Sequence, residues 1–127
     1  MAAPGFDWFH YLTLATQLSA NADEASQRSS MSRAYYCVYH KALERAVANG
    51  YMDRRSHFEL WELYNRNSAD KVCRKLYGIG ARMKKERVDA DYDRTAGRIA
   101  DRMAVQLNRA NSFLSRLGAL PPGLPKP

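Results

Sequence analysis

The sequence predicts an all-α protein, and three observations support this prediction. Apolar residues recur every three or four positions along most of the chain, which is the spacing of one face of an α-helix. Proline is nearly absent from the interior, because four of the five prolines fall at position 121 or later. No convincing strand pattern or internal repeat is present. We therefore expect an antiparallel bundle of four main helices plus a short one over residues 1–118, followed by a proline-rich disordered tail at 119–127.

The first two helices are predicted at residues 6–19 and about 23–49. The second segment contains no proline or glycine before the stop signal at Asn49-Gly50. Asn21 and Glu24 have the spacing of a capping box, which predicts the start of this helix. One side of the second helix carries a regular apolar stripe, which we expect to face the core: Met31, Tyr35, Val38, Ala42 and Ala46.

A short third helix is predicted to begin at Ser56, which forms a Ser-x-x-Glu capping box with Glu59. The fourth helix is expected to start after a cap at Asn67 or Ser68. Its apolar spacing continues through two glycines, each of which costs about 1 kcal/mol in a helix relative to alanine. We attribute Gly78 and Gly80 to close packing against another helix.

The last helix is predicted over residues 94–117, where the apolar stripe is strong. Residues 89–93 are expected to connect it to the fourth helix, with Asp91 or Asp93 as its cap.

The bulk composition indicates a cytoplasmic protein with no metal and no cofactor. A chain of 127 residues forms a single domain, and no apolar run approaches the roughly 18 residues of a membrane span. Cys37 and Cys73 are isolated, and the three histidines lack metal-ligand spacing. The net charge of +7 favours a polyanionic partner such as RNA, although an acidic protein would satisfy it equally.

Arg33 and His40 form the candidate functional pair. Seven residues nearly complete two helical turns, so these side chains share one stripe of the second helix, opposite the apolar one. Histidine exchanges protons near neutral pH, and the guanidinium binds phosphate with several donors. Cleavage of RNA by its own 2′-hydroxyl needs both a group that exchanges protons and a group that binds the phosphate. The ordinary interpretation is that the two residues only form hydrogen bonds across a helix or dimer contact.

The motif Ser-Arg-Ala-Tyr-Tyr-x-x-x-His-x-Ala at 32–42 resembles the signature of small stand-alone HEPN-domain proteins. A second block, Arg-x-x-Ala-Asp-Tyr-Asp at 87–93, is similar to a late motif of the same proteins, and Ser56-His57 resembles a third, weaker block. The resemblance covers most of positions 6–118. It implies a helical bundle that works beside a nucleotidyltransferase-like antitoxin.

HEPN ribonucleases carry an Arg-x(4–6)-His motif, and six residues separate Arg33 from His40. The resemblance therefore implies a metal-independent endoribonuclease toxin, with Arg33 on the scissile phosphate and His40 as acid or base. Two positions depart from the pattern: Ala34 stands where active members have a polar residue, and Ala42 where partner-modified members have tyrosine. The alternatives are a non-catalytic HEPN module that binds a nucleotide or a partner protein, and a purely structural dimer.

Two further groups of residues are candidates for contacts with RNA. Tyr35, Tyr36 and Tyr39 could stack on bases, although core or interface packing is their ordinary role. Asp91 and Tyr92 could touch the active groove, although fixing a helix junction is their ordinary role. Basic residues of the last helix project within roughly 80° of one another and could bind RNA or an acidic partner. The residues concerned are Arg94, Arg98, Arg102, Arg109 and Arg116. Together with basic residues of the preceding helix they could form a phosphate-binding surface: Lys71, Arg74, Lys75, Arg82, Lys84, Lys85 and Arg87.

The second helix also predicts a symmetric homodimer. Tyr36, Tyr39, Leu43 and Val47 make its other side too apolar to be left to water. A two-fold contact would bury this patch and bring two arginines and two histidines into one groove, as the HEPN resemblance also implies. Alternatively, the first or last helix of the same chain covers the patch.

Overall fold

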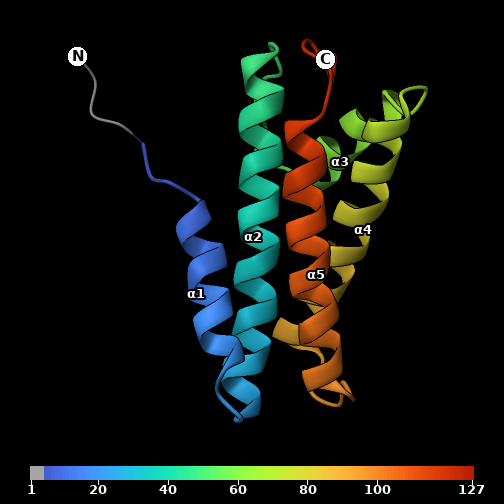
Figure 1. Ribbon diagram of the computed structural model, residues 1–127. Helices are drawn as coiled ribbons and strands as arrows, with labels where there is room; N and C mark the ends of the chain where they lie inside the picture. The colour runs from blue at the N-terminus through green and yellow to red at the C-terminus, as the bar shows by residue number, and fades with distance from the viewer. Residues whose placement is uncertain (1–4) are drawn as a thin grey trace.

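Five helices and no strand make up residues 5–127, the part of the chain that the computed structural model describes. The helices α1 and α4 run opposite to α2 and α5, and α3 is a short helix near one end (Figure 1). The predicted all-α bundle of four main helices plus a short one is confirmed. The bounds are α1 Phe9–Ser19, α2 Glu24–Ala48, α3 His57–Arg66, α4 Lys71–Tyr92 and α5 Ile99–Gly118.

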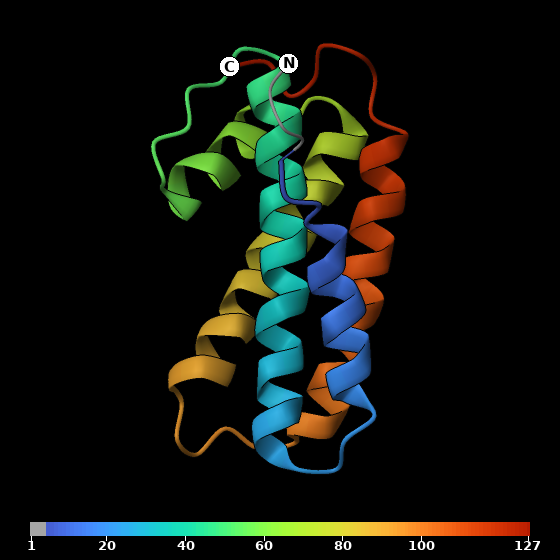
Figure 2. The same ribbon diagram turned by 90° about the vertical axis from the view of Figure 1, so that its left-hand side faces the viewer.

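Helix α2 is the centre of the bundle. It contacts each of the other four helices, and Figure 2 shows it with α1 on one side, α3 on the other and α4 crossing behind it. The predicted core stripe is confirmed, because all five of its side chains are completely buried. Four of them, all except Met31, pack in one cluster with Tyr64, Phe113 and the leucines of α3 and α4. A separate small cluster closes the far end of the bundle: Met31, Ala90, Ile99 and Met103.

Of the four predicted helix caps, one is confirmed and three differ. Ser56 caps α3 as predicted, and its hydroxyl accepts a hydrogen bond from the backbone N–H of Glu59 at 3.1 Å. The cap of α2 is Asp23, not Asn21, and the cap of α4 is Asp70, not Asn67 or Ser68. A carboxylate is a strong acceptor and also interacts favourably with the positive end of the helix dipole.

The connection between the last two helices lies later than predicted. Residues 89–92 belong to the last turn of α4, because Arg28 from α2 donates to the carbonyl oxygens of Ala90 and Asp93 at 3.0 and 2.7 Å. These bonds satisfy acceptors that a helix end leaves open. Helix α5 then begins only at Ile99, and its N-cap is Arg98, in a left-handed backbone conformation with φ of 56°. The predicted cap at Asp91 or Asp93 is wrong, because Asp91 lies within α4 and Asp93 ends that helix.

Gly80 allows close contact between α4 and α3, as predicted. Gly80 is buried, and a Cβ atom at this position would overlap the indole of Trp61. The same prediction is wrong for Gly78, which is exposed and where an added Cβ atom would have no neighbour within 4 Å. The two glycines therefore have different surroundings although they are two residues apart.

The tail at 119–127 is packed against the bundle, which corrects the expectation of disorder. Leu120 and Pro125 are buried, and the Arg45 guanidinium of α2 donates to the carbonyl oxygens of Leu120 and Leu124, both at 3.0 Å. Figure 2 shows this segment crossing the end of the bundle above α2. Among residues 5–127, no helix combines the length and the apolar character needed to cross a membrane.

Candidate functional site

Helix α2 presents Arg33, Tyr36 and His40 on one partly exposed stripe. The Arg33 guanidinium lies over two aromatic rings, with its carbon 4.9 Å from the centre of the Tyr11 ring and 5.4 Å from that of Tyr36. In the described part of the chain, no carboxylate lies within ion-pair distance of Arg33. The guanidinium is therefore held by cation–π contacts and not by a carboxylate, which leaves the donors at its edge available to an anion.

His40 lies against the indole of Trp8, the residue before α1. The two rings are parallel within 8° and their centres are 3.5 Å apart. This burial lowers the pKa of His40 below its usual value, while the more distant Asp53 carboxylate acts in the opposite direction. The imidazole is consequently neutral at pH 7 and able to accept a proton.

A second histidine, His57, reaches the same region from the first turn of α3. The Ser56 cap fixes the start of that helix and therefore the place of His57. The His57 ring stacks on Tyr39 at 3.8 Å and stands edge-on to Tyr36 at 5.9 Å.

Buried groups fix the protonation of His57. The Trp61 indole N–H donates to the Tyr35 hydroxyl at 3.0 Å, and this hydroxyl lies 2.6 Å from His57 Nδ1. Trp61 can only donate, so the Tyr35 hydroxyl can direct its own proton to Nδ1; we assign this tautomer, with the ring proton on Nε2, from the hydrogen-bond pattern. Burial, with the nearby positive charges of Arg87 and Lys84, lowers the pKa of His57 to about 4, in agreement with a neutral ring.

Helix α4 adds a second guanidinium. The carbon of the Arg87 guanidinium lies 5.4 Å from the centre of the Tyr36 ring and 5.6 Å from that of Tyr35. Arg87 pairs with Asp91 at 3.5 Å, and Asp91 also accepts from the Ser32 hydroxyl at 3.2 Å. The buried Arg87 Nε has no hydrogen-bond partner within residues 5–127, so one donor beside Tyr36 remains unused.

Two guanidiniums and two imidazoles thus surround one tyrosine ring. We name Arg33, Tyr36, His40, His57 and Arg87 the Tyr36 cluster; its His40 ring lies 6.3 Å from that of Tyr36. The predicted catalytic pair belongs to this cluster, but Arg33 and His40 form no hydrogen bond with each other among the described residues.

The other predicted groove residues have separate positions. Tyr39 is buried beneath the two histidines, at 3.8 Å from His57 and 5.2 Å from His40. Asp91 lies at the edge of the Tyr36 cluster, where it pairs with Arg87. Tyr92 is 77% exposed at the end of α4 and points to solvent instead.

Sequence reasoning did not assign His57 and Arg87 to the site. Both residues stand inside the blocks that carry the family resemblance, and Ser56 indicates a helix start immediately before His57. That signal predicts where α3 begins, but it does not predict which neighbouring helix the first turn contacts. The approach of α3 and α4 to α2 decides this.

The predicted basic face of the last helix is not continuous. Arg94 precedes α5, and Arg98 stands at its N-cap, where it pairs with Asp101 at 3.1 Å. Arg102 bridges buried Glu86 and Asp89, both at 2.7 Å, and so uses its donors inside the protein. Of the four predicted residues, Arg109 remains on the helix without an ion pair among the described residues.

Metal-ligand side chains do not gather within residues 5–127, where no group of three histidine, cysteine, aspartate or glutamate residues is placed to share an ion. Cys37 and Cys73 are buried and free. Burial raises the pKa of each thiol to about 11, so both stay protonated at neutral pH.

Comparison of the chain with protein-family models, with curated proteins and with solved structures gave no match. The functional inference therefore depends on the residues of the Tyr36 cluster and on the motifs of this chain.

Proposed function

We propose that the protein is a metal-independent endoribonuclease of the HEPN type and the toxin of a toxin–antitoxin or defence pair. The observation that supports this most is the arrangement of the Tyr36 cluster, where two cations and two neutral imidazoles lie around one ring. Two guanidiniums can hold a phosphodiester, and a neutral imidazole can accept a proton from the adjacent 2′-hydroxyl.

In the proposed reaction, the 2′-oxygen of RNA forms a bond to the neighbouring phosphorus while the bond to the 5′-oxygen breaks. Arg33 and Arg87 bind the non-bridging oxygens, whose negative charge increases in the transition state. His40 takes the 2′-proton because burial keeps its imidazole unprotonated. Solvent supplies a proton to the 5′-oxygen and later receives the one held by His40. The products are a 2′,3′-cyclic phosphate end and a 5′-hydroxyl end.

His57 has a different role in this proposal. Its Nδ1 faces the Tyr35 hydroxyl, and burial raises the pKa of Tyr35, so this hydroxyl retains its proton. A neutral Nε2–H can donate a hydrogen bond to a phosphoryl oxygen without adding charge. His57 therefore binds the phosphate and does not exchange a proton in the reaction.

The test is cleavage of total RNA by the purified protein in the presence of EDTA. Arg33→Ala and His40→Ala should each lower the rate at least about a hundredfold, the low end for one acid–base group. Both variants should retain the helical circular-dichroism signal, because neither side chain belongs to the buried core. Cleavage retained by His40→Ala would refute the proposed role of His40.

We also propose that two copies associate through the face of α2 beside His40. A shallow hollow of about 430 Å³ lies there, lined in part by Trp8, His40, Leu43 and Val47, and Val47 is 47% exposed. Light scattering should then give about twice the chain mass of 14.5 kDa. Leu43→Arg should separate the copies. A mass near 14.5 kDa for the unmodified protein would contradict the dimer.

We also propose a nucleotidyltransferase-like antitoxin as the partner of this protein, because the resemblance to HEPN proteins implies one.

One observation favours a non-catalytic alternative, in which the site binds a nucleotide or a partner protein. Both imidazoles are stacked on aromatic rings, His40 on Trp8 and His57 on Tyr39, which suits a rigid binding surface. Calorimetry with nucleotides would separate the two functions. Tight nucleotide binding that is lost in Arg33→Ala, together with no RNA cleavage by the unmodified protein, would support the binding module.

A further inference from the structure

Two adjoining hollows lie between α4 and α5 on the surface, away from the stripe of α2 that carries Arg33 and His40. Their volumes are about 440 and 460 Å³, and both are lined by Arg82 and Arg109. The two hollows differ in their charge, although each contains several cations.

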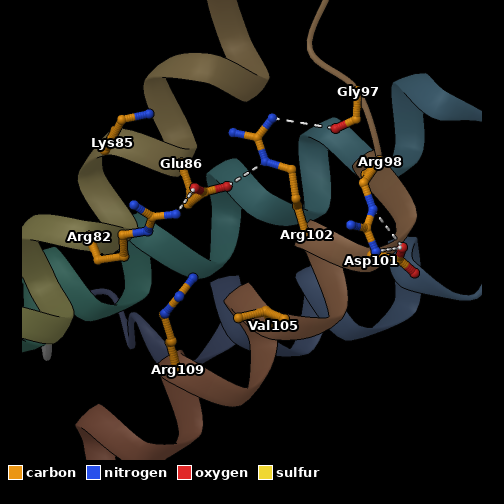
Figure 3. A pocket seen from close by; sticks show the side chains of 9 residues that line it. All are labelled: Arg82, Lys85, Glu86, Gly97, Arg98, Asp101, Arg102, Val105 and Arg109. Atoms are coloured by element: carbon orange, nitrogen blue, oxygen red, sulfur yellow. Dashed lines mark hydrogen bonds and ion pairs between the residues drawn. The ribbon is translucent and has the colours of Figure 1, made fainter.

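In the first hollow, carboxylates balance the cations. Figure 3 shows Glu86 between Arg82 and Arg102, and Asp101 turned toward Arg98. The side chain of Arg109 stands apart from these pairs in the same view. Lys85 of this hollow pairs with Asp89, which the figure does not draw. This hollow is therefore a network of internal ion pairs, in which Arg109 is the cation without an ion pair among residues 5–127.

The second hollow contains no carboxylate among its lining residues. Within the described chain, four of its five cations have no acidic partner, and Arg82 alone pairs with Glu86, at 3.3 Å. We name this hollow the α4–α5 basic groove; its cations are Lys71, Arg74, Lys75, Arg82 and Arg109.

The spacing of these cations is suited to an extended polyanion. From Lys71 to Arg82 the lining positions follow one face of α4 for eleven residues, or about 16 Å. Gly78 lies in the middle of this wall, where the absence of a side chain keeps the groove open. A row of positive charges along an open groove can contact several successive phosphates.

The chemistry of the lining also distinguishes nucleic acid from a protein partner. Ile79 is the only apolar side chain among the lining residues, and none is aromatic. Protein interfaces depend on buried aromatic and apolar anchors, which this groove lacks. The absence of aromatic rings also excludes base stacking from the groove, so its contacts would be to phosphates and independent of sequence.

We propose that the α4–α5 basic groove binds the phosphate backbone of the RNA, at a distance from the Tyr36 cluster, and so contributes to affinity and not to the chemical step. The choice of RNA as the polyanion rests on the proposed function. Because the groove and the cluster use different residues, binding and cleavage can be measured separately.

The test is the affinity for a short fluorescent 2′-O-methyl RNA, which lacks the reactive hydroxyl, measured by anisotropy at several salt concentrations. The variant replaces Arg74, Lys75 and Arg109 together by glutamine. Its affinity should fall about tenfold or more, and the slope of log affinity against log salt should fall by about 2, since each lost single-strand contact contributes about 0.7.

A matched variant removes the same charge elsewhere: Arg54, Arg55 and Arg66, all exposed, changed to glutamine. It should retain most of the affinity and the salt slope. An equal loss in both variants would show an effect of net charge only and overturn the proposal. Displacement of the RNA by poly-glutamate at a lower concentration than by polyphosphate would also overturn it, in favour of an acidic protein. His40→Ala should bind the RNA normally, so a failure of cleavage is distinguishable from a failure of binding.

Discussion

Arg33 in the Tyr36 cluster and Arg102 at the junction of α4 with α5 are held by different means. In the cluster, Arg33 lies over the rings of Tyr11 and Tyr36, and no carboxylate of residues 5–127 pairs with it. At the junction, Arg102 lies between Glu86 and Asp89, with both distances at 2.7 Å.

This difference separates a cation that can bind a ligand from one that stabilises the fold. A ring face attracts a guanidinium but does not use its N–H donors, whereas two carboxylates occupy them. Hydrogen bonds from Lys85 and Arg102 also lower the pKa of Asp89, so the junction stays charged over a wide pH range. Arg33 and Arg102 can thus have opposite roles, and the acidic side chains that reach each arginine decide which role it has. Arg87 is intermediate, because it pairs with Asp91 at 3.5 Å while its Nε has no partner among residues 5–127.

The largest expected effect is at the junction. Arg102→Gln leaves the buried Glu86 carboxylate with Arg82 as its remaining partner, and an incompletely paired buried charge is costly. We expect the free energy of unfolding to fall by about 3 kcal/mol, measured by urea denaturation.

The matched control is Arg98→Gln, which breaks a pair of the same type with side chains 82% and 69% exposed. A surface pair of this kind contributes about 0.5 kcal/mol or less. Equal losses in the two variants would show that burial of Glu86 does not distinguish the two ion pairs.

The next effect concerns the support beneath the Tyr36 cluster. Gly80→Ala places a methyl group against Trp61, whose indole N–H holds Tyr35, and should destabilise the protein by about 2 kcal/mol. Gly78→Ala should instead stabilise it by about 1 kcal/mol, because that site is open and alanine favours the helix. Thermal unfolding of both variants measures the contrast, and a stabilising Gly80→Ala would contradict the packing described for Trp61.

A smaller effect should appear in the pH dependence of stability. The pKa of His57 is about 4 in the folded protein, below the value of about 6.5 in an unfolded chain. The unfolded state therefore binds more protons below pH 6.5, and stability is lost as the pH falls from about 6.5 to 4.

His57→Gln removes this contribution, so its stability should vary less over the same pH interval. Because the ring is only partly buried, the difference between the two proteins should be on the order of 1 kcal/mol. Urea denaturation at pH 7 and pH 4.5 gives the comparison. Parallel curves for the two proteins would show that His57 does not titrate as described.

The smallest effect is on the acidic limb of the cleavage profile. Trp8→Ala removes the ring that buries His40, so the pKa of His40 should rise toward its ordinary value. The acidic limb of the rate–pH profile should then move to higher pH. Phe9→Ala, one residue away and also exposed in part, serves as the control and should leave the limb in place. If the acidic limb does not move in Trp8→Ala, the group that titrates there is not His40.

The local elements of the fold could be predicted from short-range patterns. The stripe of α2 and the Ser56 cap depend on helical periodicity and on neighbours within one turn. The close approach at Gly80 depends instead on Trp61 of another helix, and the same prediction failed at Gly78. The cap of α4 and the start of α5 lie several residues from their predicted positions. Acidic and polar residues are frequent near both ends, and the choice among them depends on contacts such as that of Arg28 with the end of α4.

What the sequence by itself determined is the set of helices, the core face of α2 and the stripe that carries Arg33 and His40. Only the tertiary structure brought His57 and Arg87 to Tyr36, paired Arg102 with Glu86 and packed the tail against Arg45. The physical reason is distance along the chain. Periodicity describes which side chains share a face of one helix, whereas these contacts join residues of different helices, and their geometry depends on how all five helices pack.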